Sequence, residues 1–174
     1  MMKRYPVIGV IGSHEDKWDR YSAPLGNLIA KIGAHLLTGA GGGVMTAVAK
    51  AFTENRHRKG FCIGIIPVEK VDDYEQKSAL YPNPYVEIPI TTQLAEKSMV
   101  DRMPFSRNIV NILSSDVIVA LPGYHGTKNE VGLSLMFDTP IILFGPEPEF
   151  EKFPQNAKIV EKIESVEDFI KDNI

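Results

Sequence analysis

The residues best suited to hold a ligand lie in two glycine-rich segments of this 174-residue chain. Each segment follows an apolar run and precedes a helical pattern. Glycine lets the backbone turn tightly and approach a ligand, and a helix N-terminus offers N–H groups and partial positive charge, so such turns bind phosphate. The candidate binding residues are Gly39, Gly41, Gly42, Gly43 and Met45 in the first segment, and Pro122, Gly123, Tyr124, His125, Gly126 and Thr127 in the second.

A third candidate loop, Gly12 and Ser13, follows the first apolar run. Glycines that only make tight turns are the alternative interpretation. Two such turns in one small protein, with this third loop beside them, favour a phosphorylated ligand over that alternative. We expect the phosphate to lie between Gly41–Gly43 and Gly123–Thr127, where two helix N-termini would converge.

The common nucleotide-binding motifs are absent. No lysine follows a glycine as a P-loop requires, which excludes a Walker-type ATPase. The dinucleotide fingerprint counted from Gly39 places Val44 at its last glycine or alanine position, and Pro67 follows the next apolar run where an acidic residue is required. We expect no ordinary NAD enzyme, no metal and no cofactor, and we find no lysine site for pyridoxal phosphate chemistry.

Arg107 and Glu130 are the charged residues near these segments that could act on a ligand. Arg107 opens a helical pattern and points almost opposite its apolar side. A solvated surface arginine is the alternative. Glu130 ends the sequence Thr127-Lys128-Asn129-Glu130, which also fits a capping box in which Glu130 only satisfies a backbone donor. The residues alone leave the ligand-facing and the structural roles equally open.

The elements that must position these residues alternate along the chain. Apolar runs predict strands at 7–11, 35–38, 61–66, 85–90, 116–121, 140–144 and 158–163, and helical spacing predicts helices at 21–32, 44–55, 106–114, 127–136 and from Ser165 onward. Residues 68–84 are polar and predict a long loop, and Pro89 predicts an edge position or a strand end. The sequence predicts an α/β, Rossmann-like fold: a doubly wound, mostly parallel sheet with helices on both faces. Ligands bind beyond the carboxyl ends of such strands, where the glycine segments would lie.

Length and composition are those of one domain, so we assign residues 1–174 to a single nucleotide-binding domain. The net charge of −3 argues against nucleic acid as a partner. Cys62 is the only cysteine and lies in an apolar run, which predicts a core residue and a reducing compartment. No signal peptide or membrane-length apolar run is present, so we expect a cytoplasmic protein with no membrane partner.

The segment from Ala120 to Glu130 resembles the PGGxGTxxE signature of the LOG ("Lonely guy") family, and Gly39 to Met45 resembles its GGGxxGLM loop. The resemblance extends from about Pro6 to Phe144. Asn83-Pro84-Tyr85 and Ser106-Arg107-Asn108 are closer to a sister branch that includes the molybdenum-cofactor carrier proteins. Residues 102–108 also resemble the DNA-processing protein family of the same superfamily.

This resemblance implies a nucleoside 5′-monophosphate phosphoribohydrolase, which releases a base and ribose 5-phosphate without metal. It implies that Arg107 and Glu130 are catalytic, that Asn108 lies at the ligand, and that Gly123, Gly126 and Thr127 hold the phosphate. It also implies a homodimer or a larger homo-oligomer, a state that helices 106–114 and 127–136 favour because they carry more apolar surface than one sheet face needs.

A non-catalytic carrier of a nucleotide-like cofactor is the alternative function. Retention of both Arg107 and Glu130 favours the enzyme. Tyr124, which replaces the second glycine of the signature, puts a large side chain where the backbone should approach phosphate, and it favours the carrier together with Ser106-Arg107-Asn108. A single-strand DNA binder is disfavoured by the acidic balance and by the lack of a basic patch with aromatic residues.

Overall fold

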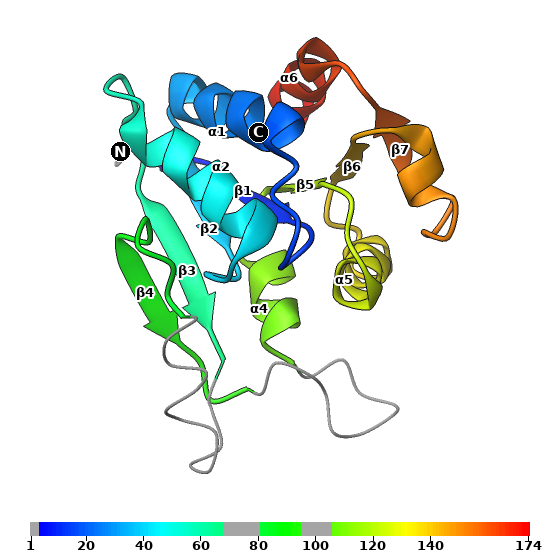
Figure 1. Ribbon diagram of the computed structural model, residues 1–174, viewed down its shortest axis with the longest axis horizontal. Coiled ribbons are helices and arrows are strands. Elements are labelled where there is room, and N and C mark those ends of the chain that lie inside the picture. Colours follow the sequence, from blue (N-terminus) through cyan, green and yellow to red (C-terminus); the bar gives the residue numbers. More distant parts are fainter. Residues whose placement is uncertain (1–3, 68–80, 95–105) are drawn as a thin grey trace.

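The structure, a computed structural model, describes residues 4–67, 81–94 and 106–174. Its centre is a seven-stranded sheet in the order β4-β3-β2-β1-β5-β6-β7, in which every pair of neighbouring strands is parallel (Figure 1). The strands are β1 Val7–Ile11, β2 His35–Thr38, β3 Cys62–Ile66, β4 Ile88–Thr91, β5 Val117–Ala120, β6 Ile141–Phe144 and β7 Lys158–Val160. The predicted α/β, doubly wound parallel sheet is confirmed.

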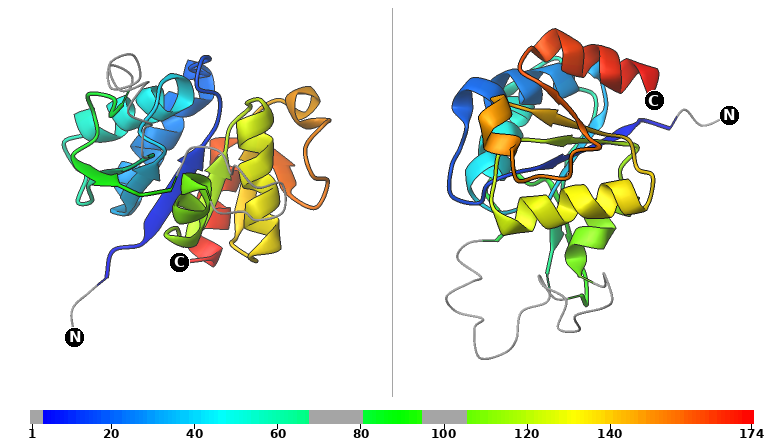
Figure 2. Two further views of the ribbon diagram at one scale, coloured as in Figure 1. Left: turned by 90° about the horizontal axis from the view of Figure 1, so that it is seen from below. Right: turned by 90° about the vertical axis from the view of Figure 1, so that its right-hand side faces the viewer.

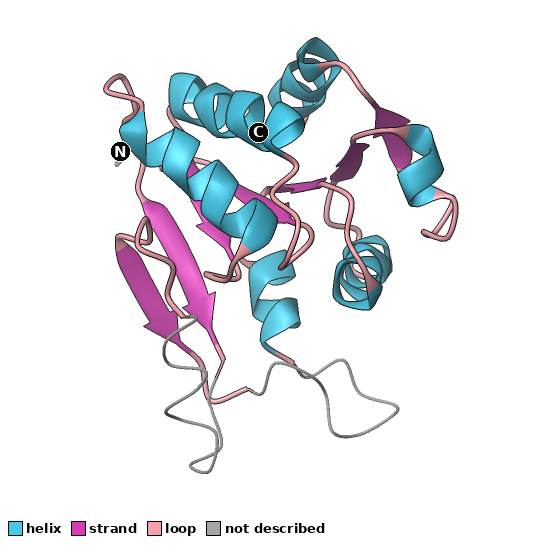
Figure 3. Cartoon of the chain, in the orientation of Figure 1, coloured by secondary structure: helices cyan, strands magenta, loops and turns pink. Residues whose placement is uncertain are grey.

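Helices cover both faces of the sheet. They are α1 Asp19–Ile32, α2 Gly43–Glu54, α4 Arg107–Leu113, α5 His125–Met136 and α6 Ile163–Asp172, with a short 3₁₀ helix, η2, at Glu147–Phe150. Helices α1, α2 and α6 lie on one face, and α4 and α5 lie side by side on the other (Figures 2 and 3). No helix in the described part of the chain has the length and apolar character needed to span a membrane.

The strand order reverses between β1 and β5. From β1 the chain proceeds to β2, β3 and β4 on one side, whereas β5, β6 and β7 continue on the other side. The loop after β1 therefore leads to α1 on one face, and the loop after β5 leads to α5 on the opposite face. A crevice opens where two such loops diverge, and it is the usual place for a ligand in an open α/β sheet.

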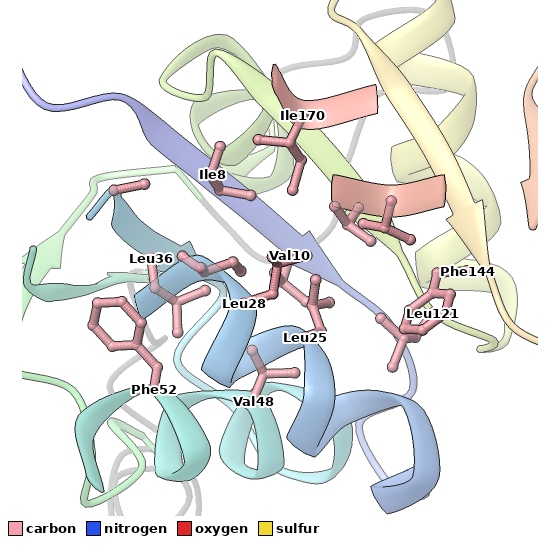
Figure 4. Packing of buried hydrophobic residues seen from close by; sticks show 14 of the residues in the cluster. Ile8, Val10, Leu25, Leu28, Leu36, Val48, Phe52, Leu121, Phe144 and Ile170 are labelled. Carbon is pink, nitrogen blue, oxygen red and sulfur yellow. The ribbon is translucent and has the colours of Figure 1, made fainter. Parts of the chain in front are cut away.

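Two apolar cores hold the layers together. The larger core joins β1, β2 and β5 to α1, α2 and α6, with Leu25, Leu36 and Phe52 among its fully buried side chains (Figure 4). The smaller core lies on the other face, where Ile112 of α4 and Val131 of α5 contact the sheet. Cys62 is buried in the larger core as predicted, and burial raises the pKa of its thiol to about 12, so the thiol stays protonated at neutral pH.

Some element boundaries differ from the predicted ones. Strand β4 begins at Ile88 and not at 85, because 83–86 forms a turn in which the Val86 N–H bonds the Asn83 carbonyl at 3.2 Å. Its edge position, predicted from Pro89, is confirmed. The last helix begins at Ile163 rather than Ser165, and η2 has no counterpart among the predicted elements. Most of the predicted loop 68–84 lies outside the described residues.

Candidate functional site

Ser13 joins the loops that surround the crevice. Its N–H donates to the Pro122 carbonyl in the loop after β5 at 3.0 Å, and its carbonyl accepts from the Val44 N–H in the first turn of α2 at 2.9 Å. Ser13 is completely buried. Ser13, in the loop after β1, therefore connects the second glycine segment to α2, the helix that follows the first glycine segment. It lies between these two parts of the chain.

The glycines around Ser13 are explained by how closely the chain segments approach one another. A Cβ atom at Gly41 would lie 2.7 Å from Nδ1 of His14, and one at Gly123 would lie 2.8 Å from the Ser13 nitrogen. Gly43 has φ +54, and a Cβ atom there would clash with the Ser13 carbonyl oxygen. A side chain at this position would therefore be strained both by its backbone conformation and by this clash. These glycines let the first and second glycine segments close around Ser13. The main chain of Ser13 lies between the two segments, and the expected phosphate position between Gly41–Gly43 and Gly123–Thr127 stays a prediction.

A cavity of about 160 Å³ opens beside Ser13 at the carboxyl ends of the strands. The predicted site residues that line it are Gly12, Ser13, Gly39, Met45, Arg107, Asn108, Tyr124, Gly126, Thr127 and Glu130. Val10, Ile11 and His14 complete its wall. The predicted residues that lie outside the wall are Gly41, Gly42, Gly43, Pro122, Gly123 and His125. The structure thus brings the charged pair, two of the five candidates of the first glycine segment and three of the six of the second to one cavity.

The N-terminus of α5 is directed at this cavity. The helix begins at His125, and its N-cap residue, Tyr124, makes no side-chain capping bond. Gly126 and Thr127 of the first turn line the cavity, and a Cβ atom at Gly126 would have no neighbour within 4 Å. The first-turn N–H groups of a helix have no partner inside the helix and carry partial positive charge, so this end of α5 suits an anion.

Glu130 does not close a capping box, and that interpretation of Thr127–Glu130 was wrong. The helix begins two residues before Thr127, so Glu130 lies in its second turn. The side chain is buried, with 9% of its surface exposed, and Oε1 lies 3.4 Å from Nδ2 of Asn111 in α4. The contact between α4 and α5 thus places a carboxyl group in the cavity wall.

Arg107 is buried and not a solvated surface residue. Its Nη1 donates to the Gly39 carbonyl and, at 3.0 Å, to the Ile65 carbonyl. The guanidinium also lies 5.5 Å from the ring centre of Tyr81. Arg107 points away from the apolar side of α4, as predicted. On that side it meets the carboxyl edge of the sheet and not solvent. It therefore joins the ends of β2 and β3 and lines the cavity as well.

The Tyr124 side chain lies at the border between the cavity and solvent. The residue contributes to the cavity wall, but 62% of its surface is exposed. Its hydroxyl donates to Oδ2 of Asp16, in the loop after β1, at 2.9 Å. This hydrogen bond, together with the negative charge of Asp16, raises the pKa of the Tyr124 phenol above its ordinary value.

Two polar residues of the site, His14 and Asn83, were not among the predicted site residues. His14 lines the cavity, with its ring centre 5.8 Å from that of Tyr81. Asn83 supports the first glycine segment, since its Nδ2 donates to the Gly41 carbonyl at 3.1 Å and its N–H donates to the Ala40 carbonyl at 2.8 Å. Ala40 adopts φ +61, a conformation that favours glycine, and the Asn83 bond holds it there. The signal for His14 was its position next to Gly12 and Ser13, the candidate loop after the first predicted strand.

No metal centre is visible in the ranges that the structure covers, since no three His, Cys, Asp or Glu side chains there gather closely enough to hold an ion. The described residues offer a helix end suited to an anion, a buried arginine and a buried carboxyl group.

Residues 5–171 match the model of the SLOG cluster4 family. The chain belongs to the SLOG cluster4 family. A relative from Archaeoglobus fulgidus, described as an uncharacterized protein, is 30% identical over 130 residues, which make up 74% of this chain and 72% of that protein. The family assignment confirms the Rossmann-like superfamily inferred from the glycine segments, at a coarser level than the LOG family that they resemble.

Solved structures of similar shape cover nearly the whole chain. The molybdenum cofactor binding protein from Rippkaea orientalis is 29% identical, with a TM-score of 0.75, and the match covers 98% of both chains. The molybdenum cofactor carrier protein from Chlamydomonas reinhardtii is 30% identical, with a TM-score of 0.72, over 97% of this SLOG chain and 98% of the other. The similarity to carrier proteins noted at Asn83–Tyr85 and Ser106–Asn108 thus extends over the whole fold.

We predict that Arg107→Met lowers the free energy of unfolding by about 2–4 kcal/mol, because two buried carbonyls lose a charged donor. Urea denaturation measures the change. Arg56→Met is the matched control, since Arg56 is exposed, and it should change stability by less than about 0.5 kcal/mol. Equal stability of the two variants would contradict the structural role of Arg107.

Proposed function

We propose that this SLOG protein binds a phosphorylated, nucleotide-like small molecule and carries it without chemical change. The observation that supports this most directly is the uncapped N-terminus of α5, which opens on the cavity at the point where the strand order reverses. The phosphate would lie against the N–H groups of Gly126 and Thr127. The hydroxyl of Thr127, whose side chain is buried at the cavity, would add a further donor.

The charge near the cavity favours an anion even though the protein is acidic overall. Arg107 contributes a positive charge to the wall, while its hydrogen bonds to Gly39 and Ile65 keep the guanidinium in place. The helix end adds partial positive charge on the other side. A volume of about 160 Å³ suits a phosphate and an adjoining sugar, so the remainder of a ligand would extend past the rim formed by His14 and Tyr124.

The carrier role is supported by similarity over the whole chain. Two proteins described as binding or carrying the molybdenum cofactor share 29% and 30% of their residues with this chain, at TM-scores of 0.75 and 0.72. The position of Arg107 agrees with a carrier, because its Nη1 is bonded to main-chain carbonyls and holds the site together. The molybdenum cofactor is therefore the first cargo to test.

Hydrolysis of a nucleoside 5′-monophosphate is a second candidate, and Glu130 is the observation that favours it. Its carboxyl group lines the same cavity as the end of α5. Cleavage of an N-glycosidic bond builds positive charge on the ribose, which a carboxylate can stabilise while it orients water. With the phosphate on Gly126 and Thr127, a ribose would lie toward Glu130, one helical turn further along α5.

We also propose a homodimer, formed through the outer side of α4 and α5. Leu113 is 57% exposed at the end of α4, and Met136 is 66% exposed at the end of α5. The two helices contact each other, and Phe137 extends the same apolar end of the layer. A second copy would cover this surface without obstructing the cavity, which lies at the opposite ends of both helices.

The phosphate position predicts the effect of Gly126→Asp. The new carboxylate would occupy the open space at the helix N-terminus, so it would stabilise α5 slightly and exclude an anionic ligand. We expect AMP or phosphate affinity to fall at least about tenfold in calorimetry, with unchanged or slightly higher thermal stability. Gly132→Asp is the matched control on the same helix, where a Cβ atom is also unopposed. Equal binding by the two variants would place the phosphate elsewhere.

The two candidate functions differ in what Glu130→Gln does. If the protein hydrolyses nucleotides, the wild type releases free base from a panel of nucleoside monophosphates, and Glu130→Gln lowers that rate by about a hundredfold or more with little change in substrate affinity. If it is a carrier, chromatography detects no base with either protein, although both bind the nucleotide. Base release at equal rates by both proteins would remove Glu130 from the mechanism.

The proposed dimer interface predicts the effect of Met136→Asp. A charge on this apolar surface should shift the mass found by light scattering at micromolar concentration from dimer to monomer. Lys152→Asp, at an exposed position outside both helices, is the control that should remain a dimer. A wild-type protein with the mass of one chain would refute the proposal.

A further inference from the structure

Two hydrogen bonds between described residues join the loop after β1 to the loop after β5. At the base of the crevice, the Ser13 N–H bonds the Pro122 carbonyl at 3.0 Å. At its rim, the Tyr124 hydroxyl bonds Oδ2 of Asp16 at 2.9 Å. The first contact is main chain to main chain and completely buried. The second joins two exposed side chains, so it can open without disturbing the fold.

Asp16 is held in position to accept this bond. Its Oδ2 lies 3.3 Å from the Ser13 hydroxyl, and its own N–H donates to the same hydroxyl at 2.9 Å. The Glu15 N–H donates to it as well, at 3.1 Å. Residues 13–16 therefore form a compact turn around one serine side chain, and the carboxylate of Asp16 projects from it toward the loop after β5.

Tyr124 is equally fixed at its main-chain end. It is the residue immediately before α5, and its carbonyl accepts from the Lys128 N–H at 3.0 Å. Gly123 before it is packed against Ser13 and Thr127. The side chain thus spans from the anion-binding end of α5 to the opposite wall. A glycine, which the LOG signature has at this position, would leave that span open.

We propose that Tyr124 and Asp16 form a tether across the rim of the cavity that sets how fast a ligand enters and leaves. This inference rests on the proposed binding function. The ligand passes the rim when the hydrogen bond is open, and the bond re-forms beside it. Because the tether is present with and without ligand, it slows association and dissociation by the same factor and leaves the affinity nearly unchanged.

The expected change in the rate of ligand exchange follows from the solvent exposure of Tyr124 and Asp16. A hydrogen bond to a carboxylate is stronger than one between neutral groups. At the surface, however, solvent and the loss of side-chain entropy reduce its net free energy. We therefore expect the loss of the tether to accelerate exchange by about three- to tenfold. The pair is too exposed to determine the stability of the fold.

Trp18 provides a fluorescence signal for the loop after β1. Trp18 is the only tryptophan, it follows Asp16 by two residues, and its ring lies 6.3 Å from that of Tyr21. It is half-buried, with a left-handed backbone at φ +47. Quenching of its fluorescence by acrylamide reports the freedom of the loop after β1 in the absence of ligand. Its fluorescence change in a stopped-flow instrument reports ligand exchange.

The experiment compares the wild type with Tyr124→Phe, which removes only the hydroxyl and keeps the ring at the rim. Tyr5→Phe is the control, because Tyr5 lies just before the amino end of β1, at the opposite edge of the sheet. AMP and inorganic phosphate are the probes. In Tyr124→Phe we expect faster association and dissociation by about three- to tenfold, a dissociation constant within about twofold of wild type, and stronger quenching of Trp18 without ligand.

Two outcomes would overturn the tether. Exchange rates of Tyr124→Phe equal to those of wild type would show that the bond does not control passage. A change in dissociation rate alone, with weaker affinity, would show that the hydroxyl contacts the ligand instead. A wild type that binds neither probe in calorimetry refutes the binding function itself, and the quenching of Trp18 then still decides whether the bond restrains the loop.

Discussion

The main chain of Ser13 is the point on which the site depends. Its N–H and C=O connect β1 to the loop after β5 and to the start of α2, and its hydroxyl organises the turn at residues 13–16. Buried backbone groups need partners, so the segments around Ser13 must approach closely. That requirement accounts for Gly43 and Gly123, where a Cβ atom would meet the Ser13 main chain.

The two glycine segments differ in the contacts that hold them and in how they face the cavity. The first segment, which contributes Gly39 and Met45 to the cavity wall, is held by side chains from elsewhere: Asn83 supports it from one side, and Arg107 holds its beginning to the end of β3. The second segment opens on the cavity through Gly126 and Thr127. Arg107 fixes the strand ends and also lines the wall. In the proposed function, its charge would act on the ligand through a guanidinium that is already held by the Gly39 and Ile65 carbonyls.

The sequence predicted most of the strands, their parallel direction and a site at their carboxyl ends, because short apolar runs and glycine turns are local signals. Glu130 was ambiguous because a capping box depends on where a helix begins, and α5 begins two residues earlier than Thr127. Arg107 was ambiguous because a helical wheel gives a direction but not what lies there. The position of Ser13 between the glycine segments is a contact between residues distant in sequence, and no local pattern encodes it.

The central position of β1 has a consequence for how the protein is made. Residues 7–66 contain β1, β2, β3 and the two helices between them, so this half can assemble from neighbouring segments of chain. The other side of β1 stays unpaired until β5 arrives, since Ile8 pairs with Val117. Pairing across such a separation is slow, and during synthesis it must wait for the second half. The cavity, built at this junction, can therefore form only after β5 and the start of α5 have been made.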